Sequence, residues 1–173
     1  MNILITGPPG VGKTSILNKI KDKLKTNGYK VGGVYTPEIR YEGKRIGFNI
    51  IDIKNGLKGV LASVDGEGPK FGKYRINLQD LDQVGVKALK KALEDVDFIL
   101  IDEIAPMELA SEKFKREIES TMNSEKPVIA VIHQKSKHKF IQNVKKRSDI
   151  TIFEVSFKNR NYMDNEIIKL LDI

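Results

Sequence analysis

The chain has 173 residues, of which 40% are apolar and 31% charged, and its formal net charge is +7. This length is sufficient for an apolar core, so we predict a single domain over residues 1–173. Because there is no cysteine and there are only two histidines, the composition excludes disulfide frameworks, thiolate metal sites and cysteine nucleophiles. It also argues against a His-rich metal site.

Charge and hydropathy limit the partners of the chain. Its longest apolar runs, Phe98–Ile101 and Val128–Ile132, are far shorter than the ~20 residues of a membrane span, so they indicate buried strands. No leader pattern opens the sequence, and we expect a cytoplasmic protein without a membrane partner, with a monomer as the favoured state. The charge is compatible with nucleic acid as a partner but does not require it, because lysines scattered over a solvated surface are the simpler interpretation.

The first third of the chain has the pattern of a βαβ unit. Asn2–Thr6 is short and apolar, and a Gly-Pro-Pro-Gly turn separates it from Lys13–Thr26, where apolar residues recur at helical spacing. Gly28 ends this predicted helix, and Val31–Tyr35 has the composition of a second strand. We therefore expect two strands joined by a right-handed crossover.

Residues 36–78 have a different pattern. Glu38–Asp52 alternates between apolar and polar residues around Glu42 and Gly43, and Asn55-Gly56 is a strong signal for a two-residue hairpin. We interpret this segment as a run of antiparallel strands inserted into the sheet.

The remainder of the chain alternates between helices and strands. A helix is predicted from Asp80, a buried strand over Asp97–Ile101, and a second helix after Ser111, which has the residue type of an N-cap. The last predicted elements are a strand over Val128–Ile132, a short helix from about Ser136, a strand over Ile150–Val155 and a helix containing Ile167, Leu170 and Leu171. This order predicts an α/β fold with a mostly parallel central sheet, helices on both faces and inserted antiparallel strands.

Residues Gly7–Thr14 match the phosphate-binding motif G-x-x-x-x-G-K-S/T between a predicted strand and a predicted helix. Glycines let backbone N–H groups surround phosphate oxygens, and the helix N-terminus adds its dipole. Lys13 suits the β and γ phosphates, which gives it a catalytic role, and the Thr14 hydroxyl suits Mg²⁺. The motif predicts the P-loop NTPase fold and a nucleotide-binding set of Gly7, Pro8, Pro9, Gly10, Val11, Gly12, Lys13, Thr14 and Ser15.

The apolar run that starts at Asp97 ends in two carboxylates, Asp102 and Glu103, which is the form of a Walker B segment. In a parallel sheet we expect this strand end beside the phosphate loop, where Asp102 binds Mg²⁺ through water and Glu103 orients or deprotonates the attacking water. Acidic residues also follow strands as helix caps, but the pairing with the loop favours the functional interpretation. The predicted nucleotide-binding set here is Phe98, Ile99, Leu100, Ile101, Asp102, Glu103, Ile104 and Ala105.

Other polar residues keep two interpretations. His133 follows the predicted strand Val128–Ile132 and has the position of a γ-phosphate sensor, but a solvent-facing loop histidine fits the sequence equally well. Arg40, Arg45 and Arg160 are candidates for a cation that stabilises charge during phosphoryl transfer, although each taken singly is better explained as a surface residue.

Together these segments resemble the small P-loop nucleoside-triphosphatase family that includes the human cancer-related nucleoside-triphosphatase and its bacterial and archaeal relatives. The resemblance spans nearly the whole chain and rests on Gly7–Thr14, Val34–Arg40, Arg45–Phe48, Gly72–Tyr74, Ile101–Leu109 and Asn159–Asn161. It implies slow Mg²⁺-dependent hydrolysis of ATP, GTP and other triphosphates with little base selectivity. Ala105 stands where this family usually has Gly, and Ser15 where it often has Thr; neither difference removes a proposed ligand.

Two other functions remain alternatives. A nucleotide or small-molecule kinase has the same loop and a similar size, but it needs an acceptor hydroxyl, whereas Glu103 favours water as the acceptor. A nucleic-acid-stimulated ATPase or a non-catalytic binding module is suggested by the net charge of +7. Either would bind DNA or RNA with strong salt dependence.

Overall fold

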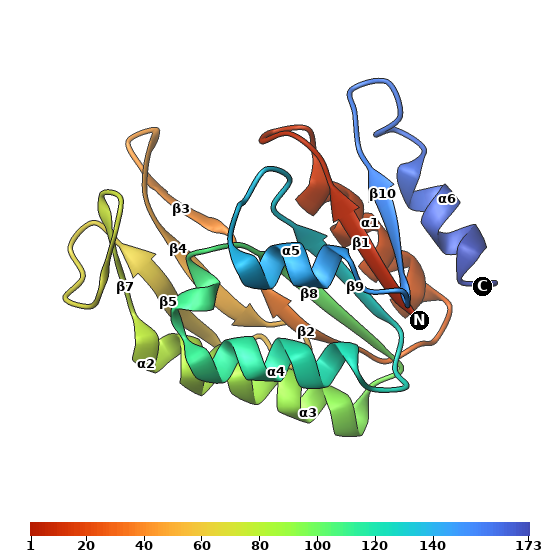
Figure 1. Cartoon of the computed structure of the whole chain (residues 1–173), viewed down its shortest axis with the longest axis horizontal. Helices are drawn as coiled ribbons and strands as arrows, with labels where there is room; N and C mark the ends of the chain where they lie inside the picture. Colours follow the sequence, from red (N-terminus) through yellow and green to blue (C-terminus); the bar gives the residue numbers. More distant parts are fainter.

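The computed structural model describes residues 1–173, which form one mixed sheet with helices packed against it (Figure 1). The strands are β1 (Asn2–Thr6), β2 (Val31–Tyr35), β3 (Glu38–Tyr41), β4 (Lys44–Asp52), β5 (Lys58–Ser63), β6 (Lys70–Phe71), β7 (Tyr74–Ile76), β8 (Phe98–Ile104), β9 (Val128–Ile132) and β10 (Ile150–Glu154). The helices are α1 (Lys13–Thr26), α2 (Leu78–Asp80), α3 (Lys87–Asp95), α4 (Glu112–Met122), α5 (Lys139–Lys145) and α6 (Met163–Leu170). None of them has the length and apolar character that a membrane crossing needs.

The 10-stranded sheet has two parts that meet at β2. Its order is β10-β1-β9-β8-β2-β4-β5-β7-β6, with β3 paired to β4. All neighbours from β10 to β2 are parallel, whereas β4 and the strands beyond it are antiparallel. We call these the parallel half and the antiparallel extension. The predicted α/β fold, with inserted antiparallel strands in residues 36–78, is confirmed.

The turns of the antiparallel extension differ from the prediction in one place. The two-residue turn is at Glu42 and Gly43, whose φ angles of 48° and 74° are both positive, as a primed hairpin turn requires. Asn55-Gly56 lies instead in a longer connection between β4 and β5, where the Asn55 side chain accepts a hydrogen bond from Leu57 N–H at 2.8 Å. The expected two-residue hairpin at Asn55-Gly56 is therefore wrong.

Two helices start at positions other than those predicted. The helix expected from Asp80 begins at Leu78, because the Asn77 side chain accepts a hydrogen bond from Asp80 N–H at 3.0 Å, and a π-helical stretch links α2 to α3. The helix expected from Ser136 begins at Lys139, after a cap at His138. The cap at Ser111 is confirmed, since its hydroxyl accepts a hydrogen bond from Phe114 N–H at 3.0 Å.

The parallel half has a separate apolar core on each face, as the alternation of side chains along strands requires. On β8, Phe98 and Leu100 belong to the core shared with α1 and α6. Ile99 and Ile101 belong to the core shared with α3, α4 and α5. The same alternation turns the next residue after Ile101, Asp102, toward the face that carries α1.

Candidate active site

The phosphate loop lies between β1 and α1. Gly10 and Gly12 have φ angles of 75° and 107°, which glycine adopts without the strain that a Cβ causes. Gly7 packs so closely on the end of β10 that a Cβ there would lie 2.6 Å from the Val155 carbonyl oxygen. The first turn of α1 contains no acidic residue of its own, which favours an anion at this helix N-terminus.

Lys13 points back over the loop that precedes it. Its ammonium group donates hydrogen bonds to the carbonyl oxygens of Gly7 at 2.9 Å and Pro8 at 3.0 Å. Burial lowers the pKa of Lys13, and the charges of Glu103 and Asp102 oppose this shift. Lys13 is therefore close enough to interact electrostatically with both predicted carboxylates, Asp102 and Glu103.

The acidic end of β8 reaches the phosphate loop across another strand. In the sheet, β9 lies between β1 and β8. The acidic strand end nevertheless lies beside the phosphate loop, as expected, because Thr14 at the start of α1 donates a hydrogen bond from its hydroxyl to Asp102 Oδ1 at 2.9 Å. The loop and the acidic strand end thus meet over the end of β9.

Asp102 is buried, with only 3% of its surface exposed. Burial raises its pKa to about 6, although the hydrogen bond from Thr14 acts in the opposite direction. A carboxylate held in such an environment is favoured in its charged form by a cation at the same place.

Glu103 lies at an irregularity of β8. Asp102 pairs with Val131 and Ile104 with Ile132, so Glu103 is the extra residue of a β-bulge. Bulges redirect a side chain and are frequent next to active sites. Glu103 is half-buried, and β8 continues through Ile104, beyond the predicted strand end at Ile101.

The other residues predicted on this segment lie in the core. Phe98 and Ala105 are at most 8% exposed, and the side chains of Ile99, Leu100, Ile101 and Ile104 have no exposed surface. Their side chains pack in the core and hold Asp102 and Glu103 in place. Their assignment to the nucleotide-binding set stays a prediction.

His133 follows β9 at the edge between the loop and β8. Its backbone N–H donates to the Ile104 carbonyl oxygen at 3.1 Å, and its Nδ1 is buried without a hydrogen-bond partner. A fully solvated loop histidine is therefore excluded.

Two arginines that were candidates for transition-state stabilisation are held by neighbours in the antiparallel extension. Both Arg40 and Arg45 form ion pairs with Glu38, at 2.8 and 2.9 Å. Arg45 also donates to the Tyr74 hydroxyl at 2.8 Å and lies 5.2 Å from the Phe48 ring centroid. These contacts explain both arginines as structural residues of β3 and β4.

Two residues near the acidic strand end were not singled out from the sequence. The Thr36 hydroxyl donates a hydrogen bond to the Asp102 carbonyl oxygen. Glu108 is 3% exposed and its Oε2 has no partner; burial, and after it the charge of Glu103, raises its pKa well above the usual range. Glu108 could have been identified from the sequence as the carboxylate within the apolar run Ile104–Leu109.

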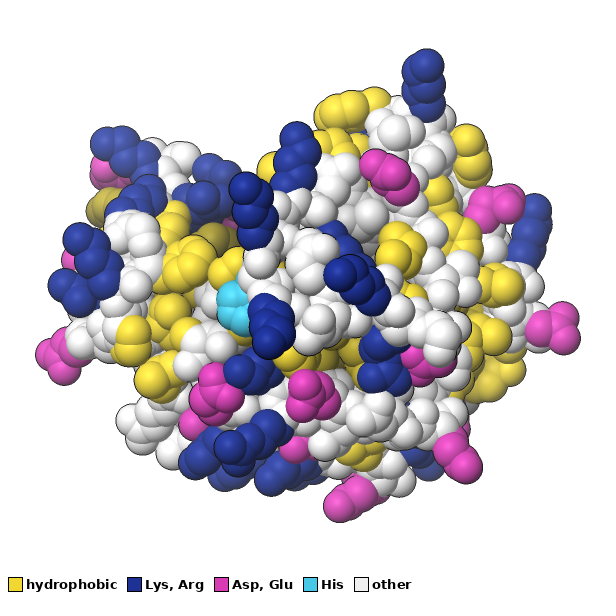
Figure 2. Space-filling model, in the orientation of Figure 1, with side chains coloured by type: hydrophobic (Ala, Val, Ile, Leu, Met, Phe, Trp, Pro, Cys, Tyr) yellow, Lys and Arg dark blue, Asp and Glu magenta, His cyan; other side chains and the backbone are white.

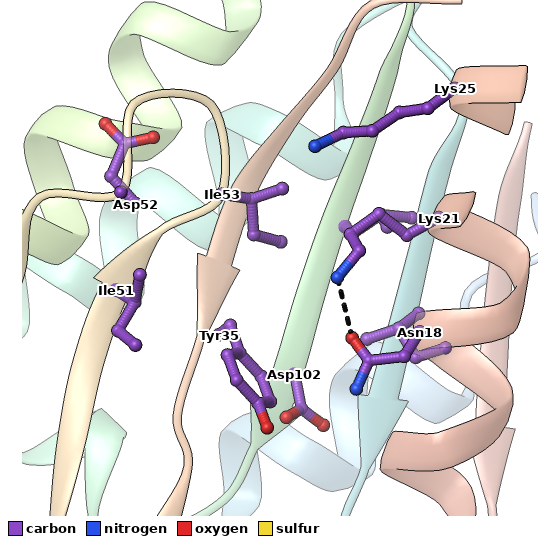
Figure 3. A pocket seen from close by; sticks show the side chains of 11 residues that line it. Asn18, Lys21, Lys25, Tyr35, Ile51, Asp52, Ile53 and Asp102 are labelled. Carbon is purple, nitrogen blue, oxygen red and sulfur yellow. Dashed lines mark hydrogen bonds between the residues drawn. The ribbon is translucent and has the colours of Figure 1, made fainter.

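A pocket of about 150 Å³ borders this site between α1 and the strands β2 and β4. Figure 3 shows Lys21 and Lys25 extending toward it from α1, with Ile51 and Ile53 opposite and Asp102 at one end. It is lined by Leu17, Asn18, Lys21, Lys25, Tyr35, Ile51, Asp52, Ile53, Gly56, Leu100 and Asp102. No residue of the loop Gly7–Thr14 lines it, so it is a neighbour of the phosphate site and not the site itself.

Comparison with known proteins relates this geometry to a family. Residues 2–168 match the model of the protein family described as NTPase. The nucleoside-triphosphatase THEP1 of Thermotoga sp. (strain RQ2) is 47% identical over 172 residues, which cover 99% of this chain and 95% of the relative. The protein of the same name from Methanothermobacter thermautotrophicus is 43% identical over 171 residues, which cover 99% and 96%.

Two solved structures are similar over nearly their whole length. The crystal structure of THEP1 from the hyperthermophile Aquifex aeolicus has a TM-score of 0.88 and 30% identity, with 100% of both chains covered. The solution structure of a human cancer-related nucleoside triphosphatase has a TM-score of 0.83 and 29% identity, and covers 98% of this chain and 96% of that one. The chain therefore belongs to the NTPase family of P-loop enzymes, the family that its motifs resemble.

Proposed function

We propose that the chain hydrolyses the terminal phosphoanhydride of nucleoside triphosphates in a Mg²⁺-dependent reaction that releases nucleoside diphosphate and phosphate. We include ATP, GTP and other triphosphates, with little base selectivity. The observation that carries the proposal is the 2.9 Å hydrogen bond from Thr14 to Asp102, because it joins the phosphate loop to the acidic end of β8. The names of the relatives support hydrolysis of nucleoside triphosphates.

The donor atoms at this point fit Mg²⁺. A hydroxyl oxygen and a carboxylate oxygen are hard ligands of the kind that Mg²⁺ prefers. No group of three or more His, Cys, Asp and Glu residues in the chain could hold a metal, so the remaining ligands would be phosphate oxygens and water, the usual arrangement in P-loop enzymes. When bound, Mg²⁺ neutralises charge on the β and γ phosphates.

Two side chains carry out the other steps of the reaction. Lys13 exchanges its contacts with Gly7 and Pro8 for the β and γ phosphate oxygens, and the backbone N–H groups of the loop hold the same anion. Glu103 accepts a proton from a water molecule while the water oxygen attacks the γ phosphorus. The bond to the bridging oxygen breaks, and its electron pair leaves with the nucleoside diphosphate.

Phosphate release tests the proposal directly. Each of ATP, GTP, CTP and UTP is supplied with Mg²⁺ or with EDTA, without an acceptor and with or without DNA or RNA. We expect release with all four in Mg²⁺ only, and a loss of at least about 10³-fold in Lys13→Ala. Lys19→Ala is the control, because Lys19 is exposed on the same helix.

Two results would contradict the proposal. Turnover that appears only when an acceptor hydroxyl is added would assign a kinase. Turnover that requires DNA or RNA and falls steeply with salt would assign a nucleic-acid-stimulated ATPase. On the face shown in Figure 2, Lys and Arg are spread over the whole surface and are not gathered in one patch.

A further inference from the structure

The loop Ser156–Tyr162, between β10 and α6, lies beside the phosphate loop. Val155 N–H donates to the Thr6 carbonyl oxygen at 2.7 Å, and its own carbonyl oxygen is the atom that a Cβ on Gly7 would approach to 2.6 Å. Figure 1 shows this loop next to the turn between β1 and α1, at the same edge of the sheet. A nucleotide held by its phosphates at Gly7 would therefore have this loop as a neighbour.

Two planar side chains are presented by this loop. Phe157 is 64% exposed, and the Arg160 guanidinium carbon lies 5.1 Å from the centre of its ring. Arg160 takes part in none of the ion pairs of the chain. Arg45, the other arginine that lies over aromatic rings, is tied to Glu38. Of these two arginines, Arg160 is therefore the one without an acidic partner.

The loop is also held in shape before any ligand arrives. Asn159 accepts a hydrogen bond from Ser156 N–H at 2.8 Å and donates one to the Glu154 carbonyl oxygen at 2.9 Å. Arg160 N–H donates to the Ser156 carbonyl oxygen at 3.0 Å. A loop fixed in this way loses little conformational freedom when its side chains bind a ligand.

We propose that Phe157 and Arg160 form a stacking platform for the base of the bound nucleotide. The proposal rests on the proposed function, which supplies the nucleotide, and it adds the subsite for the base. Aromatic and guanidinium planes stack on any base, because every base has a π-face, and stacking reads no hydrogen-bond pattern. Such a subsite accounts for binding of purines and pyrimidines alike, with the larger purine ring bound more tightly.

The test separates the base from the phosphates. Calorimetry in Mg²⁺ measures binding of a non-hydrolysable ATP analogue and of inorganic tripolyphosphate, which carries the phosphate chain without a base. We expect Phe157→Ala to weaken the analogue roughly 5- to 100-fold and to leave tripolyphosphate unchanged. Phe157→Tyr should keep the affinity of the wild type, and Arg160→Gln should weaken the analogue by a smaller factor.

Phe71→Ala is the matched control, because Phe71 is an exposed phenylalanine on β6 in the antiparallel extension. If Phe157→Ala weakened binding of the analogue and of tripolyphosphate equally, the substitution would have disturbed the phosphate loop, and the platform would be contradicted. Unchanged affinity for the analogue would also contradict it. Loss of binding to a single-stranded oligonucleotide, with nucleotide binding intact, would assign the pair to nucleic acid instead. Failure of the wild type to bind tripolyphosphate would contradict the proposed function itself and the platform with it.

Discussion

The parallel half and the antiparallel extension differ in where they keep their polar residues. Every residue of β1 and β9 is buried, because helices cover both faces of these strands. β4 is only partly buried, and β3 and β6 are mostly exposed. In the parallel half, a polar residue such as Asp102 at the end of a strand therefore indicates a functional site, because parallel strands present functional residues there. In the antiparallel extension, polar residues occur along whole strands, so a single one does not indicate function.

The strongest test of this difference replaces one glutamate by glutamine in each region. Glu103→Gln removes the proton acceptor proposed for the attacking water, so we expect turnover to fall about 10²- to 10⁴-fold while analogue binding stays within a few-fold. Glu38→Gln, in β3, should leave turnover within about threefold, since its partners are the structural arginines Arg40 and Arg45. Steady-state phosphate release measures both variants, and equal losses would end the distinction between the two regions.

The joint between the regions is expected to be sensitive to a single methyl group. Gly33 on β2 has a φ of +115°, and a Cβ there would lie 1.9 Å from the Leu100 carbonyl oxygen. Gly33→Ala should therefore reduce the free energy of unfolding by about 3 to 5 kcal/mol. Gly56 also has a positive φ, of +76°, but nothing within 4 Å of the added atom, so Gly56→Ala should cost about 1 kcal/mol.

Urea denaturation compares these two glycine variants with the wild type. Because β2 pairs with β8 on one side and β4 on the other, Gly33→Ala should shift the unfolding of both regions in one transition. A variant that loses only the antiparallel extension would show that the regions unfold separately.

Burial of Asp102 predicts how stability depends on pH in metal-free protein. Its pKa rises from an ordinary value of 3.8 to about 6 on folding, so between these values the folded state binds more protons than the unfolded state. The free energy of unfolding contributed by this group therefore decreases as the pH rises from about 4 to 6 and is constant above that. Two pKa units correspond to about 3 kcal/mol.

Asp102→Asn removes this dependence while keeping an oxygen that accepts from Thr14. In EDTA the variant should equal the wild type near pH 4 and exceed it by up to about 3 kcal/mol at pH 7, as measured by denaturation at each pH. A stability difference that is the same at both pH values would contradict the assigned burial. With Mg²⁺ present the variant should lose the metal-dependent part of its turnover.

The elements of the parallel half were predictable because local patterns specify them. Continuous apolar runs identified β1 and β9, and the motif Gly7–Thr14 placed the loop between a strand and a helix. The lateral order of the strands was not predictable in this way. That β9 separates β1 from β8 depends on how distant crossover segments pack, which no local periodicity encodes.

The candidate site was predictable to the same extent. Asp102 and Glu103 were identified as carboxylates that end an apolar run, but the bulge that displaces Glu103 arises from pairing with β9 and leaves no local mark. Glu108 owes its raised pKa first to burial in the folded chain, which no local sequence pattern encodes. In the antiparallel extension, Asn55-Gly56 has the residue types of a tight hairpin, yet its neighbours pair in another register.

Arg45 lies in the antiparallel extension, where we expect a substitution to lower stability and to leave turnover nearly unchanged. Arg45→Ala removes the ion pair with Glu38 and the hydrogen bond to Tyr74, so the free energy of unfolding should fall by about 1 to 2 kcal/mol. Turnover should change less than threefold, and Arg75→Ala, an exposed arginine on β7, should change neither quantity. A residue that only supports β4 can change the rate only by changing how much of the protein is folded. If Arg45→Ala reduced turnover more than tenfold without loss of stability, the antiparallel extension would therefore supply a cation to the reaction.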